Sequence, residues 1–239
     1  MFERGIAIVS LTKRGVATAK RIRRALEKGQ IRYEVYAPES LRSEGIKSFN
    51  GDLAGLLGEI FNVLDGIIAV MAVGIVVRSI APYITSKETD PAVVVVDDLG
   101  KYAISLLSGH LRGANHLAKM VAGEIGAIAV VTTATDLLGK KSVENIAEEY
   151  DLKIVNFESI TPVNSAIVND GKVLFVSIGT SVLPEMDATP PKVISSVDEL
   201  RETMEGYDAG IVIAPSTLPL ESLTKPVTLL VPKAAPPSC

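Results

Sequence analysis

The sequence predicts an α/β fold: an open, mostly parallel but mixed sheet with helices on both faces, followed by a smaller α/β domain. Short apolar runs alternate with segments of helical spacing, which is the pattern of a parallel sheet covered by helices. The valine run at 92–96 is apolar without alternation, as in a strand buried on both faces. Only residues 97–101 separate it from the next apolar run. Because a link of that length makes a hairpin, one pairing in the sheet should be antiparallel.

The predicted first domain, residues 1–138, alternates strands and helices along the chain. Val16, Ala19, Ile22 and Leu26 recur at helical spacing after the first apolar run, which predicts an amphipathic helix. The remaining apolar runs are short and are separated by Gly, Pro or polar residues, as strands and loops are. The predicted strands are 6–10, 31–36, 66–70, 92–96, 102–107 and 127–131, and the predicted helices are 15–28, 52–64 and 114–124.

The pattern changes after Asp136, and we predict a smaller α/β domain over 139–232 with a tail or linker at 233–239. Ser142 is placed to cap a helix, and Pro162 suits the first turn of another. We predict helices at 142–150, 159–168 and 196–204, strands at 154–155, 173–178, 210–214 and 227–231, and a proline-rich loop at 181–192.

Composition and charge narrow the function classes. The chain has 24 Lys and Arg against 28 Asp and Glu. Dedicated nucleic-acid binders carry a basic excess, so we expect no nucleic-acid partner. No apolar run is long enough to span a bilayer, so we expect no membrane partner. The single cysteine, Cys239, has no internal disulfide partner, which favours a reducing compartment, and we predict a cytoplasmic protein.

Several familiar catalytic motifs are missing from the sequence. It contains no phosphate-binding Gly-x-x-x-x-Gly-Lys-Ser/Thr loop, no Gly-x-Ser-x-Gly nucleophile elbow and no Gly-x-Gly-x-x-Gly after the first strand. No group of Cys and His has structural-zinc spacing. We therefore predict no metal site and no nucleotide-driven reaction.

A first candidate loop follows the predicted strand 66–70. Gly74 is expected to let the backbone turn tightly, and Arg78 lies one turn inside the helix that begins there. The free amides of that helix and a guanidinium both suit a carboxylate or a phosphate. The alternative is a helix-capping glycine and a surface arginine.

The second candidate loop joins the strand of the predicted hairpin to the helix that follows it. Gly109 and Gly113 relax its backbone, and His110, one of two histidines, lies on the loop itself. An imidazole there can serve as general acid or base near neutral pH. Ser108 and Asn115 are candidates to orient a substrate oxygen or a water. The alternative is a plain connection in which the histidine caps a carbonyl.

A third candidate loop, after the strand 127–131, carries Thr132, Thr133, Thr135 and Asp136. Hydroxyls and a carboxylate at a strand end can hydrogen-bond a polar substrate. The alternative is a threonine-rich strand end followed by an aspartate that caps a helix.

Asp97 and Asp98 end the valine strand. They can act as acid and base, bind a cation or close a turn, and turn closure is the commonest use of an Asp-Asp-x-Gly stretch. Because ligands of open α/β sheets bind outside the carboxyl ends of strands, we expect the three loops and these carboxylates to surround one site.

Four segments in one order resemble the cobalamin biosynthesis protein G family: 71–78, 90–97, 108–115 and 132–136. The remainder resembles that family's middle domain more weakly. The resemblance implies a cobalt-precorrin-5A hydrolase of anaerobic cobalamin biosynthesis. Such an enzyme opens the δ-lactone of the macrocycle and releases acetaldehyde, giving cobalt-precorrin-5B. Cobalt belongs to that substrate, so no cofactor is expected.

The resemblance also implies roles for the candidate residues. A corrinoid carries acetate and propionate arms, which suit helix N-termini, guanidinium groups and hydroxyls. Lactone opening needs an activated water and donors for the oxyanion. We hypothesise that His110 is the base, Asp97 its orienter or competitor, and the amides near Gly109 and Gly113 the oxyanion donors. The substrate would then be held by Arg78, Asn115 and Thr135.

The chain departs from the family pattern at two positions in these segments. Arg112 stands where a second glycine is more frequent, and Val73 where threonine is frequent. Arg112 is expected either to pair with a substrate carboxylate or to narrow the loop. Family members commonly continue into a C-terminal domain that is not found before Cys239.

The C-terminal domain of other family members suggests partners besides the corrinoid. The expected ones are a separate polypeptide with the C-terminal domain, neighbouring enzymes of the cobalamin pathway, or a second copy of the chain in a homodimer. The main alternative function is a non-catalytic subunit that binds or channels a corrinoid intermediate. A further alternative is an α/β module for a phosphorylated metabolite.

Overall fold

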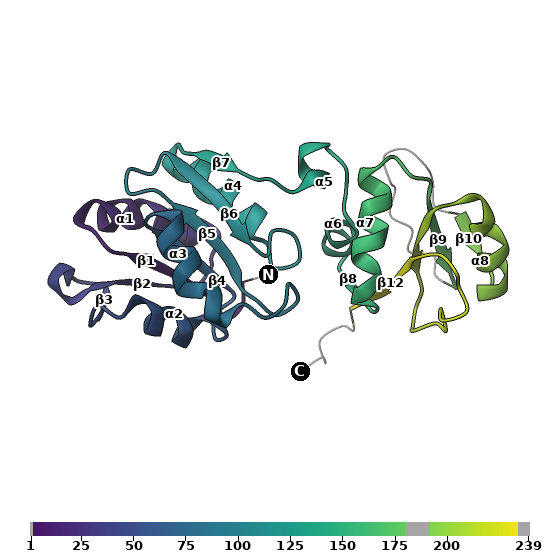
Figure 1. The fold of residues 1–239 in the computed structure, drawn as a ribbon, viewed down its shortest axis with the longest axis horizontal. Coiled ribbons are helices and arrows are strands. Elements are labelled where there is room, and N and C mark those ends of the chain that lie inside the picture. The colour runs from purple at the N-terminus through teal and green to yellow at the C-terminus, as the bar shows by residue number, and fades with distance from the viewer. Residues whose placement is uncertain (1, 180–191, 234–239) are drawn as a thin grey trace. The chain divides into compact units, whose positions relative to one another are not determined.

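The computed structural model describes residues 2–179 and 192–233. They form two compact units that divide between Thr132 and Thr133, and each unit has its own sheet (Figure 1). The predicted tail beyond Lys233 and most of the predicted loop 181–192 lie outside the described residues.

The first unit is built on a seven-stranded sheet in the order β3-β2-β1-β4-β5-β6-β7. Neighbouring strands are parallel except β5 and β6, which form an antiparallel hairpin. The predicted mixed, mostly parallel sheet is thereby confirmed. Its strands are β1 (Ile6–Ser10), β2 (Tyr33–Pro38), β3 (Lys47–Phe49), β4 (Gly66–Val70), β5 (Ala92–Val96), β6 (Tyr102–Leu107) and β7 (Ile128–Val130).

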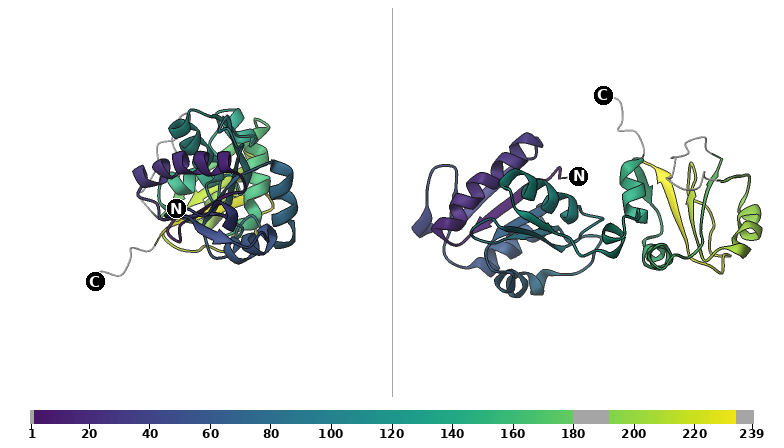
Figure 2. Two further views of the ribbon diagram at one scale, coloured as in Figure 1. Left: turned by 90° about the vertical axis from the view of Figure 1, so that its left-hand side faces the viewer. Right: turned by 90° about the horizontal axis from the view of Figure 1, so that it is seen from above.

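Helices cover both faces of this sheet (Figure 2). α1 (Lys13–Lys28) and α4 (Ala114–Ile125) pack on one face, and α2 (Leu53–Phe61) and α3 (Val73–Ile80) pack on the other. Every residue of β1, β4 and β5 is therefore buried, which explains their apolar sequences without alternation. Two short 3₁₀ helices complete the unit, η1 (Glu39–Leu41) and η2 (Ala81–Tyr83).

The hairpin decides at which edge of the sheet each loop lies. β1, β4 and β5 end together, so Asp97 and the start of α3 share one edge, called here the Asp97 edge. Because β6 returns antiparallel, its last residue Leu107 pairs with Val93 near the start of β5. The loop that follows, with His110, lies at the opposite edge, called here the His110 edge.

The second unit has a five-stranded sheet in the order β10-β9-β11-β12-β8, in which only the pairing of β8 with β12 is antiparallel. α7 (Ile160–Val168) packs on one face, and α8 (Val197–Thr203) covers the core on the other. The remaining elements are α5 (Ala134–Leu137), α6 (Val143–Glu149), β8 (Leu152–Ile154), η3 (Phe157–Ser159), β9 (Val173–Ile178), β10 (Lys192–Ile194), η4 (Met204–Gly206), β11 (Ala209–Ile213) and β12 (Val227–Pro232).

Some elements differ from the prediction. β3 and β10 are short strands that the sequence did not predict, and each exposes two of its three residues. The helix expected to reach residue 64 ends at Phe61. The second unit begins before α5, because α5 packs on α7 of that unit, whereas the sequence places the boundary between residues 138 and 139.

Candidate functional site

The loop between β6 and α4 has a fixed backbone. Ser108 has a φ of 59° and Gly113 a φ of 81°, both in the left-handed region. The amides of Gly113, Ala114 and Asn115 donate to the carbonyls of His110 (3.0 Å), Ser108 (3.2 Å) and Gly109 (3.0 Å). These bonds hold His110, which is partly exposed, on a rigid turn rather than on a flexible loop.

The buried side chain of Asn115 supports this turn. Its side chain is 5% exposed, and its Oδ1 accepts a hydrogen bond from Ser105 Oγ at 2.7 Å. A Cβ atom on residue 109 would lie 2.8 Å from that same Oδ1, so the close approach requires glycine there. The structure thus places Asn115, predicted to contact substrate, in the support of the loop, and it explains Gly109 by packing.

Ser108 supplies the least expected feature of the site. A left-handed backbone costs a non-glycine residue about 1–2 kcal/mol. The Ser108 Oγ atom is also buried without a hydrogen-bond partner among the described residues. The backbone N–H of Gly113, in contrast, is used inside the turn. Ser108 Oγ is therefore a buried donor that this loop leaves unsatisfied.

An ion-pair cluster connects Arg112 of this loop with Asp65 and Arg4, which precede β4 and β1 at the same edge. Asp65, just before β4, accepts from the backbone N–H of Arg4 at 2.7 Å and from Arg4 Nε at 2.7 Å, and Arg112 Nη2 lies 3.2 Å from its Oδ1. Burial raises the pKa of Asp65, but the hydrogen bonds from Arg4 and the charges of Arg4 and Arg112 outweigh it, so the pKa lies below its ordinary value. Sequence reasoning missed Arg4 and Asp65, since nothing in their local pattern signals a contact across the chain.

The two arginines keep cationic donors for a ligand. Each guanidinium has five N–H groups, and Asp65 neutralises only one of the two positive charges. The Arg112 side chain is 26% exposed and that of Arg4 48% exposed. This edge can therefore bind a carboxylate close to His110, in line with the expectation that Arg112 pairs with a substrate carboxylate.

Asp97 lies at the Asp97 edge and has a structural role. Its Oδ1 accepts from Leu99 N (2.9 Å), and its Oδ2 accepts from Lys101 N (2.8 Å) and Tyr102 N (2.7 Å). Burial raises the pKa of Asp97, but these backbone amides outweigh it and lower the pKa below its usual range. The hypothesis that Asp97 orients His110 is wrong, because the antiparallel β6 carries His110 to the opposite edge.

Gly74 and Arg78 also lie apart from His110. Gly74 is inside α3 and is not among the described glycines with positive φ, so the expected tight turn at this position is wrong. Arg78 is exposed, and its Nη1 donates to the carbonyl of Gly74 at 3.1 Å. The first turn of α3 has no side-chain cap, and its Ile75 and Val76 amides donate to the carbonyl of Ala72.

The third loop divides between the two units. Thr132 is the last residue of the first unit, after β7, which runs parallel to β6. Thr133 and Asp136 belong to the second unit, where Thr133 Oγ1 donates to Asp136 Oδ2 at 2.8 Å in the first turn of α5. Thr135 is buried there. The expected grouping of all three loops around one site is therefore limited, within the first unit, to the loop of His110 and the end of β7.

Within residues 2–179 and 192–233, no three His, Cys, Asp or Glu side chains are grouped as metal ligands would be. No helix in the same ranges is both long and apolar enough to cross a membrane.

Two family models match the chain, and both describe cobalamin biosynthesis protein G. The model of its N-terminal region matches residues 55–136, and the model of its central region matches residues 141–231. The chain belongs to the cobalamin biosynthesis protein G family. The N-terminal match contains β4 to β7 and both edges of the first sheet, so His110, Asp65 and Asp97 lie within it, while Arg4 does not.

Named relatives agree with this membership. A cobalt-precorrin-5A hydrolase from Priestia megaterium is 36% identical over 171 residues, which are 71% of this chain and 46% of the relative. A cobalt-precorrin-5A hydrolase from Salmonella typhimurium is 37% identical over 169 residues, which are 70% of this chain and 47% of the relative. The chain therefore spans about half the length of these relatives.

The fold is shared with a solved member of the family. A crystal structure described as a cobalamin biosynthesis protein G homologue from Sulfolobus solfataricus aligns with a TM-score of 0.54 at 25% identity. The alignment covers 97% of this chain and 61% of that one.

Proposed function

We propose that this chain forms the N-terminal and central part of a cobalt-precorrin-5A hydrolase of anaerobic cobalamin biosynthesis. The observation that carries the proposal is its identity of 36% and 37% with two relatives of that name over 71% and 70% of the chain. The reaction opens the δ-lactone of the macrocycle with water and releases a two-carbon unit as acetaldehyde, leaving cobalt-precorrin-5B.

The chemistry is assigned to the His110 edge. His110 takes a proton from a water, which adds to the lactone carbonyl carbon as the carbonyl oxygen becomes an oxyanion. Ser108 Oγ, which has no partner among the described residues, and the Gly109 amide donate to that oxyanion. The lactone C–O bond then breaks and leaves an alkoxide on the two-carbon unit. That alkoxide becomes the carbonyl of acetaldehyde as the C–C bond to the macrocycle breaks, and the macrocycle carbon takes the electron pair and the proton held by His110.

Substrate recognition uses the cations of the same edge. Arg112 and Arg4 are placed to bind acetate or propionate arms, since Asp65 neutralises only part of their combined charge. Thr132 is a further candidate from the first unit, and Thr133, Thr135 and Asp136 are candidates from the second. The chain needs no cofactor of its own in this proposal, because the cobalt is part of the substrate.

The remaining expectations are part of the same proposal. The hydrolase acts in the cytoplasm, and its partners are the corrinoid substrate and a polypeptide equivalent to the remaining half of the longer relatives. The experiment incubates the chain with cobalt-precorrin-5A and measures acetaldehyde. Acetaldehyde release that depends on His110 is the expected result. Tight corrinoid binding with no acetaldehyde, even with that second polypeptide present, would instead support a binding or channelling subunit.

A further inference from the structure

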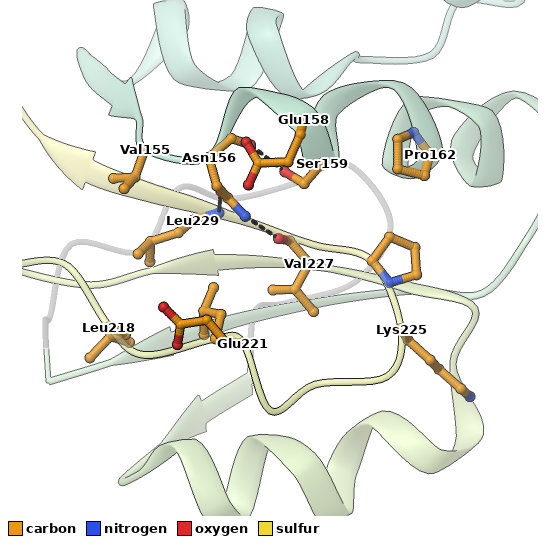
Figure 3. Close-up of a pocket in the computed structure, with 12 residues that line it drawn as sticks. Val155, Asn156, Glu158, Ser159, Pro162, Leu218, Glu221, Lys225, Val227 and Leu229 are labelled. Atoms are coloured by element: carbon orange, nitrogen blue, oxygen red, sulfur yellow. Dashed lines mark hydrogen bonds between the residues drawn. The ribbon is translucent and has the colours of Figure 1, made fainter.

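The second unit contains a cavity of about 410 Å³ that no part of the proposed reaction uses (Figure 3). It lies beside β12, between the η3–α7 segment on one side and the connection from β11 to β12 on the other. Its size falls within the roughly 300–1,000 Å³ of ordinary small-ligand sites. Its apolar lining, called here the base, is formed by Val155, Val227 and Leu229 together with Leu218 and Leu220 of that connection.

The connection 214–226 makes the outer wall and is held in place. It lies wholly within the described residues, has neither helix nor strand, and exceeds the roughly 12 residues beyond which such connections are uncommon and usually functional. Lys225 Nζ donates to the carbonyls of Met204, Glu205 and Tyr207 at η4. Arg201 Nη2 donates to Ser222 Oγ at 2.8 Å. The cavity is therefore preformed.

The uncharged polar side chains of the inner wall are already satisfied. Asn156 Oδ1 accepts from Leu229 N at 2.8 Å, and its Nδ2 donates to the carbonyl of Val227 at 2.7 Å. Ser159 Oγ bonds to the carbonyl of Asn156 and to Thr228 Oγ1, each at 2.7 Å. Because these groups bond to the protein itself, they contribute little to the choice of ligand.

Two carboxylates are the charged groups left to face a ligand. Glu158 stands on the inner wall and Glu221 on the outer wall, with Val227 and Leu229 between them in Figure 3. Neither carboxylate has a hydrogen bond or an ion pair with a described residue. Lys225 contributes its aliphatic stem, but its ammonium is bound to backbone carbonyls and points away from the cavity. The cavity therefore combines an apolar base with two unneutralised negative charges.

We propose that this cavity binds an aliphatic cation, meaning an ammonium or guanidinium group on an apolar stem. The stem covers the base formed by the valine and leucine side chains, and the cationic head pairs with Glu158 and Glu221. A carboxylate arm of a corrinoid is repelled by the same two groups, so the site is distinct from the His110 edge. This inference does not rest on the proposed function, and it holds for a free amine or for a lysine or arginine side chain.

The test compares three ligands of equal stem length on the full chain by NMR titration. Hexylammonium should shift the methyl signals of Val227, Leu218 and Leu229 at lower concentration than hexanol, and hexanoate should bind weakest. Equal binding of all three, or preferred binding of hexanoate, would overturn the proposal without any mutation. An acetylated Leu-Lys-Leu tripeptide amide separates the sources: tighter binding than hexylammonium assigns the site to a polypeptide side chain, and weaker binding assigns it to a free amine.

Variants of Glu158 and Glu221 test whether these carboxylates pair with the cationic head of the ligand. Glu158→Gln and Glu221→Gln should each weaken hexylammonium binding about two- to fivefold, the range of a partly exposed ion pair, and leave hexanol binding unchanged. Glu148→Gln removes an exposed carboxylate of α6 outside the cavity and serves as the matched control. If the double variant Glu158→Gln/Glu221→Gln still preferred hexylammonium as strongly as the parent, the proposal would be wrong.

Discussion

The two edges of the first sheet carry the same kinds of residues but use them differently. At the Asp97 edge, the carboxylate of Asp97 accepts hydrogen bonds from three backbone amides that close the β5–β6 hairpin. At the His110 edge, a left-handed serine keeps a buried hydroxyl without a partner among the described residues. A carboxylate there, on Asp65, is shared between two arginines that keep other donors. The Asp97 edge also has buried atoms without partners among the described residues, Ser10 Oγ and Asp98 Oδ1, so the His110 edge differs in combining such a hydroxyl with a histidine and two arginines.

The largest expected effect is at His110. His110→Ala should lower acetaldehyde release by about 10²–10⁴-fold, the range for loss of a general base, because water would no longer be deprotonated. The measurement is acetaldehyde formed per folded protein, with the unfolding midpoint as control. His116→Ala is the matched variant, since His116 is exposed on α4 and should keep activity. Full activity of His110→Ala would remove the His110 edge from the chemistry.

The next effect is at Ser108. Ser108→Gly should reduce turnover by about 10²-fold, as for loss of one oxyanion donor. Its stability should lie between unchanged and about 1 kcal/mol higher, because glycine adopts the left-handed backbone without strain. Turnover and urea unfolding on one preparation test both. A variant that loses stability and keeps turnover would make Ser108 merely structural.

Arginines on the two edges give a paired test. Arg112→Ala should raise KM about tenfold with little change in kcat, since it removes a charge-assisted contact to a substrate arm. Arg78→Ala should change KM less than about twofold, because its guanidinium lies at the Asp97 edge on the carbonyl of Gly74. Steady-state kinetics of both variants decide the matter, and the reverse ranking would exchange the roles of the two edges.

Asp97 should affect stability and not turnover. Asp97→Asn should cost about 1–3 kcal/mol, because an amide replaces a carboxylate that accepts three backbone N–H groups. The folded pKa of Asp97 lies below its unfolded value, so its stabilisation is present above the unfolded pKa, about 3.9, and is lost as the pH falls through the folded value. Urea unfolding at pH 7, 4 and 3 should therefore show the difference between the parent and the variant shrinking with acidity. A constant difference would contradict the assignment.

The sequence predicts the elements better than it predicts their arrangement. The helix with Val16, Ala19, Ile22 and Leu26, the valine strand and the Ser142 cap are local patterns, and the structure has all three. The hairpin was also predicted, and its antiparallel pairing is confirmed.

The site was harder to predict because it depends on contacts between distant residues. One strand reversal moves His110 to the edge opposite Asp97, so candidates that are neighbours in sequence become separated in space. The pairing of Arg4 and Arg112 with Asp65 joins residues far apart in the chain, and no local pattern signals it. The left-handed backbone of Ser108 is equally hidden, since serine rarely adopts it.

The most direct test locates the corrinoid on the first sheet. Backbone amide signals of the chain are followed by NMR as cobalt-precorrin-5A is added. The largest changes are expected for Gly109 to Arg112 and for Arg4, with little change for Val73 to Arg78 and for Leu99 to Tyr102. Changes confined to those last two segments would place the substrate at the Asp97 edge and contradict the assignment of the chemistry to His110.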